Sequence, residues 1–124
     1  MLKVYKCNHC GNVIVKLLDA GVPVMCCGEQ MVELKENSTE AATEKHLPVL
    51  TRDGNVVNVE VSTVTHPMTP EHWITFIAIE TEKRYQIKRL DPTDAPKASF
   101  VEENKVIKVY EYCNLHGLWV SEGE

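Results

Sequence analysis

The chain has 124 residues, 44% of them hydrophobic and 25% charged, which is enough to bury a sizeable core in one domain, or in one small and one medium domain. The net charge of -5 argues against a polyphosphate-binding surface. The N-terminus lacks an apolar run of signal-peptide length, and no stretch approaches the roughly 18 apolar residues of a membrane span, so we expect a cytoplasmic protein.

The five cysteines are the first chemical signal in the chain. Their odd number means that a closed set of disulfides would leave at least one thiol over. In a chain without a signal sequence, Cys-x-x-Cys spacing is more often metal-binding or catalytic than a structural disulfide. We therefore consider metal sites first.

Residues 1–36 are predicted to form a small N-terminal metal knuckle. Cys7 and Cys10 are separated by two residues, and the adjacent pair Cys26 and Cys27 follows fifteen residues after Cys10. Short apolar runs at residues 2–5 and 13–18 are predicted strands, and the glycine that ends each cysteine cluster can adopt positive φ. A segment below about 40 residues usually needs a metal, disulfides or a partner chain to stay folded.

The spacing of these four cysteines narrows the type of knuckle. The first pair is spaced as in a zinc ribbon or a rubredoxin-like knuckle, but the second pair is vicinal, so the chain must bend sharply and the tetrahedron should be distorted. This arrangement resembles desulforedoxin, a small ferric tetrathiolate protein. Thiolates suit zinc as well as iron, and reactive thiols or a disulfide are the alternative. His9 is interpreted as a bystander, because four thiolates complete the shell.

Residues 37–124 are predicted to form a second domain, an immunoglobulin-like antiparallel β-sandwich. The polar stretch 37–40 is the predicted linker. Strands are expected at residues 47–51 and 56–62, joined by a hairpin turn centred on Asp53-Gly54. Further strands are expected at 73–79, 85–90, 105–112 and 118–121, with prolines between them and no convincing helical period. The whole chain is therefore predicted to be mainly β.

The second domain contains a second set of candidate metal ligands. Cys113 and His116 are separated by two residues near the C-terminus, and three more histidines lie in loops or at strand ends, namely His46, His66 and His72. A single histidine beside apolar residues is more often structural, and a lone cysteine is often a buried apolar thiol. Two prolines stiffen the loop between His66 and His72, so both side chains could be held towards one point at low entropic cost.

The composition of this set weighs against two common metals. Blue copper uses two His, one Cys and a weak axial Met, but no methionine follows His116 closely and two histidines would be left unexplained. Structural zinc normally closes at four ligands. Four imidazoles and one thiolate suit a five-coordinate iron with one open position.

The motifs Glu44-Lys45-His46, His66-Pro67, His72-Trp73 and Cys113-Asn114-x-His116-Gly117 together resemble the superoxide reductase family. With the N-terminal cysteines, the whole chain resembles desulfoferrodoxin, the two-iron form of that family. The resemblance implies ferrous iron with four equatorial histidines and Cys113 as axial thiolate, reducing superoxide to hydrogen peroxide. It also implies roles for Lys45, in attracting the anion and orienting water, and for Glu44, which would bind ferric iron after product leaves.

The resemblance further implies two iron ions per chain, a homodimer, and a small redox donor such as rubredoxin; zinc could replace iron in the four-cysteine site. Another class of function is an electron carrier, in which both metals relay electrons without superoxide chemistry of their own. Nucleic acid and membranes are not expected partners.

Overall fold

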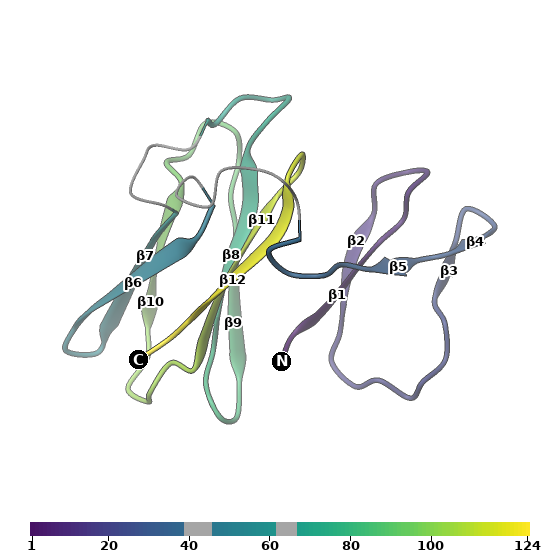
Figure 1. The fold of residues 1–124 in the computed structure, drawn as a ribbon. Coiled ribbons are helices and arrows are strands. Elements are labelled where there is room, and N and C mark those ends of the chain that lie inside the picture. Colours follow the sequence, from purple (N-terminus) through teal and green to yellow (C-terminus); the bar gives the residue numbers. More distant parts are fainter. Residues whose placement is uncertain (39–45, 62–66) are drawn as a thin grey trace. The chain divides into compact units, whose positions relative to one another are not determined.

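The computed structural model describes residues 1–38, 46–61 and 67–124, and these residues form strands, turns and loops without any helix (Figure 1). No helix in these ranges could therefore span a membrane. The chain divides into two compact units, Met1–Lys35 and Glu36–Glu124. The strands are β1 Lys3–Lys6, β2 Val13–Lys16, β3 Met25–Cys26, β4 Glu29–Gln30, β5 Val32–Glu33, β6 Pro48–Asp53, β7 Val56–Val61, β8 Ile74–Glu80, β9 Tyr85–Arg89, β10 Lys97–Val101, β11 Lys108–Cys113 and β12 Gly117–Glu122.

The first unit is a small antiparallel structure built around two cysteine turns. One sheet has the order β2-β1-β5, and β3 and β4 form a separate hairpin. Gly11 and Gly28 adopt the predicted positive φ, at 82° and 75°. Its buried hydrophobic residues are few: Leu2, Val4, Cys7 and Met31.

The second unit is the predicted antiparallel sandwich. One sheet has the order β10-β7-β6 and the other β12-β11-β8-β9 (Figure 1). In β7, alternate valines turn inward because successive strand side chains point to opposite faces. They pack against the isoleucines of β8 and against Val109 and Cys113 of β11; the buried core residues include Val57, Val59, Val61, Ile74, Ile77, Ile79, Val109 and Cys113.

Two local details differ from the sequence prediction. The first hairpin pairs Asp53 with Val56, so its two-residue loop is Gly54-Asn55, and Gly54 supplies the positive φ that such loops need at their first position. Strand β10 was not predicted, because it is short and follows two prolines. Its inward side chains, Ala98 and Phe100, alternate with exposed neighbours.

The beginning of the second unit is fixed to its sheet. Asn37, in the stretch predicted to be a linker, donates its backbone N–H to Leu118 O at 2.9 Å. Its side chain also bonds both backbone groups of Val120, at 2.9 and 3.1 Å. Residue 37 is therefore anchored on β12.

A β-bulge shapes the end of the sandwich that carries the histidines. Tyr112 pairs with Phe76 and Cys113 with Ile74, so Thr75 has no partner of its own on β11. Such an extra residue re-aims the side chains around it. Here it allows Ile74 and Cys113, which are direct partners, both to enter the core.

Candidate metal centres

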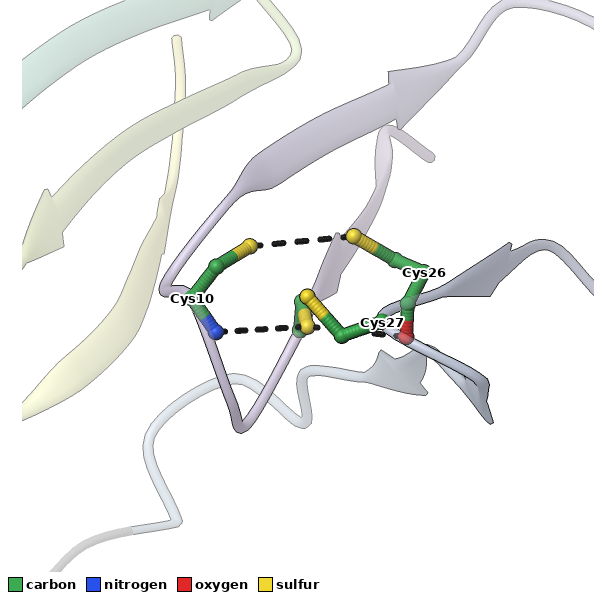
Figure 2. A group of neighbouring side chains, drawn as sticks. Cys10, Cys26 and Cys27 are labelled. Atoms are coloured by element: carbon green, nitrogen blue, oxygen red, sulfur yellow. Dashed lines mark hydrogen bonds between the residues drawn. The ribbon is translucent and has the colours of Figure 1, made fainter.

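The four cysteines of the first unit come together at the ends of two turns. Their sulfur atoms all lie within 4.8 Å of one another. Figure 2 shows Cys10, Cys26 and Cys27 with their thiols turned towards a common space, and the sulfurs of Cys10 and Cys26 are 3.7 Å apart. Cys27 has a positive φ of 54°, which produces the sharp bend expected between adjacent ligands.

Backbone amides surround these sulfurs and stabilise negative charge on them. The N–H of Cys10 points at Cys7 Sγ at 3.5 Å, and the N–H of Asn12 at Cys10 Sγ at 3.4 Å. The hydrogen bond from Cys10 lowers the pKa of Cys7 to about 6. Hydrogen bonding with Cys10 and the other thiols raises the pKa of Cys27 to about 12. A cation among the four sulfurs would remove this conflict, because metal ligation requires thiolates.

His9 lies between the first two cysteines but is directed elsewhere. Its Nε2 is 2.9 Å from Glu29 Oε1, and both side chains are more than half exposed. His9 is therefore engaged with a carboxylate that follows the second cysteine pair, in accord with its interpretation as a bystander.

The second cluster joins His46, Cys113 and His116. Their nearest candidate ligand atoms all lie within 4.8 Å of one another, and Cys113 Sγ is 4.0 Å from His116 Nδ1. His46 precedes β6, Cys113 ends β11, and His116 lies in the turn before β12. His72 precedes β8, and its ring meets that of His116 edge to face, with centroids 4.9 Å apart.

His46 is the most enclosed of these histidines, with 2% of its surface exposed. The indole of Trp119 stacks on its imidazole, with centroids 5.0 Å apart and an interplanar angle of 15°. Its Nδ1 lies 3.7 Å from Glu111 Oε1. A carboxylate beside one ring nitrogen favours a proton there and leaves the other nitrogen available to a metal.

The surroundings of Cys113 act on its thiol in opposite directions. Burial raises its pKa, whereas hydrogen bonds from the backbone N–H groups of His116 and Leu115 lower it. Glu111, two residues earlier on the same strand, is fully buried, and burial raises its pKa well above the ordinary value. Two buried acids close to several imidazoles are a suitable environment for a cation, which would favour the ionised form of both.

Three predicted site residues, Glu44, Lys45 and His66, lie outside the described residues. The described part of the chain thus brings together three of the four predicted histidines and the predicted cysteine. Glu111 and Trp119 also line this site and were not predicted from the sequence. The signal for Glu111 is its position in the strand: it alternates with Val109 and Cys113, so its side chain points to the same face of β11 as these two core residues. A charged residue at such a position is unusual.

Comparison with known proteins identifies the family of the chain. The desulfoferrodoxin family model matches residues 38–122. The chain belongs to the desulfoferrodoxin family. It is 42% identical to a desulfoferrodoxin of Nitratidesulfovibrio vulgaris over 97% of this chain and 95% of that protein, and 43% identical to one of Syntrophotalea carbinolica over 98% and 97%. The crystal structure of the superoxide reductase from Treponema pallidum has a TM-score of 0.83, with 33% identity over 98% of both chains.

Both clusters fit the metals implied by membership in the desulfoferrodoxin family. The first offers only thiolate sulfur, the donor set of iron or zinc tetrathiolates. The second combines a buried thiol with imidazoles and with a carboxyl that could orient one of them. The two candidate centres are thus chemically distinct, and each is built within a single unit.

Proposed function

We propose that this protein is a superoxide reductase, an oxidoreductase that reduces superoxide by one electron to hydrogen peroxide. The observation that carries the proposal is the meeting of His46, His72, His116 and buried Cys113 at one end of the sandwich, in a chain of this family. A superoxide reductase structure matches essentially the whole chain.

The residues that would hold iron are these four and, by resemblance, His66. Ferrous iron bound there would supply the single electron that superoxide needs, and the overall reaction consumes one superoxide, one electron and two protons per hydrogen peroxide. Cys113 would donate electron density to the metal through its thiolate, a known means of tuning iron centres. The N–H groups of Leu115 and His116 would limit that donation by bonding the sulfur.

Two further residues, Lys45 and Glu44, are assigned supporting roles from the sequence. Lys45 directly precedes His46 in a region that is acidic overall. A local cation can raise the encounter rate of a small anion by about 10 to 1,000-fold, and its ammonium group can orient water that delivers protons. We propose that Glu44 binds the ferric centre once product has left.

The tetrathiolate centre would hold a second iron, with zinc as the alternative. We propose that it serves in electron supply, because Cys10 and Cys27 are exposed while Cys7 is buried. A small redox protein of the rubredoxin kind would be the donor, and a homodimer in the cytoplasm the working form. In this role the protein would remove superoxide under oxidative stress.

A Cys113→Ser variant tests the catalytic assignment. We expect the thiolate-to-iron charge-transfer band to disappear and stoichiometric peroxide production to fall sharply, while the tetrathiolate spectrum stays. Cys7→Ser is the matched control in the other centre, and it should give the reverse spectral change while the pre-reduced protein still produces one peroxide per histidine–cysteine centre in a single turnover. An unchanged visible spectrum in Cys113→Ser would remove this residue from the site.

Lys45→Ala tests anion attraction separately. Superoxide consumption by the reduced protein should slow, because the variant lacks the charge that attracts the anion. The dependence of the rate on ionic strength should also weaken, because less attraction is left for salt to screen. Lys97→Ala, an exposed lysine of β10, is the control. A wild-type rate for Lys45→Ala at every salt concentration would contradict the steering role.

An electron carrier is the second candidate, favoured by the exposed sulfurs of the first unit. The metal centres of an electron carrier would become oxidised, but the second centre would not form one peroxide per superoxide. Rapid mixing of reduced protein with superoxide, with peroxide counted, separates the two functions. A copper relay is less well supported, because His46 and His116 lie beside Cys113 and the ring of a third histidine, His72, contacts that of His116. The Met68 sulfur, in turn, accepts the N–H of Ile74 at 3.4 Å.

A further inference from the structure

Asn114 directly follows Cys113 and uses both ends of its side chain on the segment that carries His72. Its Oδ1 accepts the backbone N–H of Trp73 at 2.9 Å, and its Nδ2 donates to the carbonyl of Glu71 at 2.9 Å. Its own backbone N–H donates to the carbonyl of Trp73 at 3.3 Å. The residues on either side of His72 are therefore both held by one amide side chain.

The orientation of this amide follows from its partners. The N–H of Trp73 can only donate and the carbonyl of Glu71 can only accept, so oxygen must face the first and nitrogen the second. Asparagine is the shortest side chain with one acceptor and one donor group in a fixed plane. An aspartate would keep the first contact but would place an oxygen against the Glu71 carbonyl.

The backbone of His72 is fixed on its other side by its own loop. Its N–H donates to Thr69 O at 3.1 Å, and its carbonyl accepts the N–H of Thr69 at 2.9 Å. These contacts set the local turn but connect to no other ligand-bearing element. Asn114, by contrast, directly follows Cys113 and precedes His116, so its bonds connect the segment that carries these two residues to both neighbours of His72, next to the backbone pairing of Cys113 with Ile74.

We propose that Asn114 is a positioning residue of the histidine–cysteine centre, which sets the direction from which His72 approaches the position between Cys113 and His116. The ring of His72 stands at 85° to that of His116, with centroids 4.9 Å apart. A short amide clamp on both neighbours of His72 holds this angle. Without it, the segment can shift while its Thr69 turn stays intact, and the imidazole leaves the geometry that the metal needs.

This inference rests on the proposed metal function of the site, so its test uses binding and spectra rather than activity. Co²⁺ serves as the probe in the full-length chain, because its ligand-field bands report coordination geometry. The difference between wild type and Cys113→Ser isolates the histidine–cysteine centre from the tetrathiolate. Asn114→Ala removes both side-chain contacts, and Asn114→Asp removes one. Asn58→Ala is the control, because it removes an amide of β7 that accepts a hydrogen bond from Ser99 on β10.

We expect Asn114→Ala to release Co²⁺ from the histidine–cysteine centre to a chelator about 10 to 100-fold faster than wild type, the usual cost of losing such a supporting contact. Its ligand-field bands should shift, and Asn114→Asp should lie between. Release from the tetrathiolate should not change, and Asn58→Ala should match wild type. Wild-type release and bands in Asn114→Ala would overturn the proposal, as would faster release with unchanged bands and an equally lowered melting temperature of the metal-free protein.

The same experiment separates this proposal from the proposed function. If wild type and Cys113→Ser give identical Co²⁺ spectra and stoichiometry, the cluster is no metal centre and both proposals fail. If wild type binds Co²⁺ there and Asn114→Ala behaves identically, only the positioning role fails. If the Asn114 variants shift the bands but the iron-loaded protein yields no peroxide from superoxide, the positioning role stands and the catalytic function falls.

Discussion

The indole of Trp119 lies nearly parallel to the imidazole of His46, with ring centroids 5.0 Å apart, and the same indole donates its N–H to the backbone carbonyl of His116 at 3.1 Å. One side chain thus contacts two candidate ligands that lie 70 positions apart in the chain. Trp119 is almost fully buried. Its packing therefore contributes to stability and to the geometry of the centre at the same time.

Two substitutions separate these contributions. Trp119→Phe keeps an aromatic face against His46 but loses the hydrogen bond to His116, so we expect unfolding to become easier by about 1 to 2 kcal/mol. Trp119→Leu also loses the stacked face and leaves a cavity, at a cost of about 3 kcal/mol. Urea unfolding of the metal-free protein measures both. Tyr110→Phe, which removes the buried hydroxyl that donates to Glu80 at the far end of β8, is the control, with a loss of stability but no change in metal spectra.

Glu111 predicts an unusual pH dependence of the metal-free protein. Burial raises its pKa in the folded state, whereas an unfolded glutamate titrates near about 4.3. As pH rises above that value, the unfolded chain has released a proton that the folded protein retains, so the free energy of unfolding decreases until the folded pKa is passed. Glu111→Gln cannot ionise, so this decrease should be absent from the variant.

Urea unfolding of the metal-free protein between pH 4.5 and 8 tests the role of Glu111. Glu103→Gln, at an exposed position, is the control and should follow wild type. Parallel stability curves for wild type and Glu111→Gln would show that Glu111 does not carry the effect. In the metal-bound protein the cation should favour the ionised form of Glu111 in the folded state as well. The stability curves of wild type and Glu111→Gln should therefore differ less in their dependence on pH.

Metal removal should affect the first unit far more than the second. Only four hydrophobic side chains of Met1–Lys35 are buried in the structure, and none of its strands is longer than four residues. A unit of this size rarely folds on burial alone. Chelation under reducing conditions should therefore abolish hydrogen-exchange protection in β1 and β2 while β8 and β11 remain protected. Retained protection in β1 after complete metal loss would contradict this expectation.

The sequence was most informative where a pattern is local. Alternating valines at 57, 59 and 61 are typical of a half-buried strand, and the nearly continuous β-prone run at 73–79 predicted another strand; the structure has β7 and β8 there. The cysteine turns also followed from spacing and glycine positions. These features depend on contacts between residues near in the chain, which is why periodicity and turn chemistry detect them.

Contacts between distant segments were not predictable in the same way. The bulge at Thr75 depends on the register between β8 and β11. The clamp of Asn114 on Trp73 spans 41 positions, and Trp119 reaches His46 only because β6 and β12 pack together. A sequence lists the residue types for such contacts, but their pairing is decided by how the two sheets stack.

The two glutamates nearest the C-terminus, Glu122 and Glu124, should contribute differently to the free energy of unfolding as the pH falls. Arg52 binds both carboxylate oxygens of Glu124, at 2.6 and 2.8 Å, and Val106 N–H donates to the same group at 2.9 Å. The bond from Arg52 is the main reason that the pKa of Glu124 falls to about 2. Glu122 also pairs with a cation, Lys108, but its side chain is 83% exposed.

Because the folded pKa of Glu124 is depressed, its contribution is complete above about 4.3, the unfolded value, and is lost as pH falls towards about 2. Glu124→Gln should lower the free energy of unfolding by about 1.5 kcal/mol at pH 7 and by much less near pH 2. Glu122→Gln should change it by less than about 0.5 kcal/mol at either pH, because exposed ion pairs contribute little. Urea unfolding at pH 7, 4 and 2.5 distinguishes the two, and equal losses in both variants would mean that the bidentate contact with Arg52 adds nothing beyond surface charge.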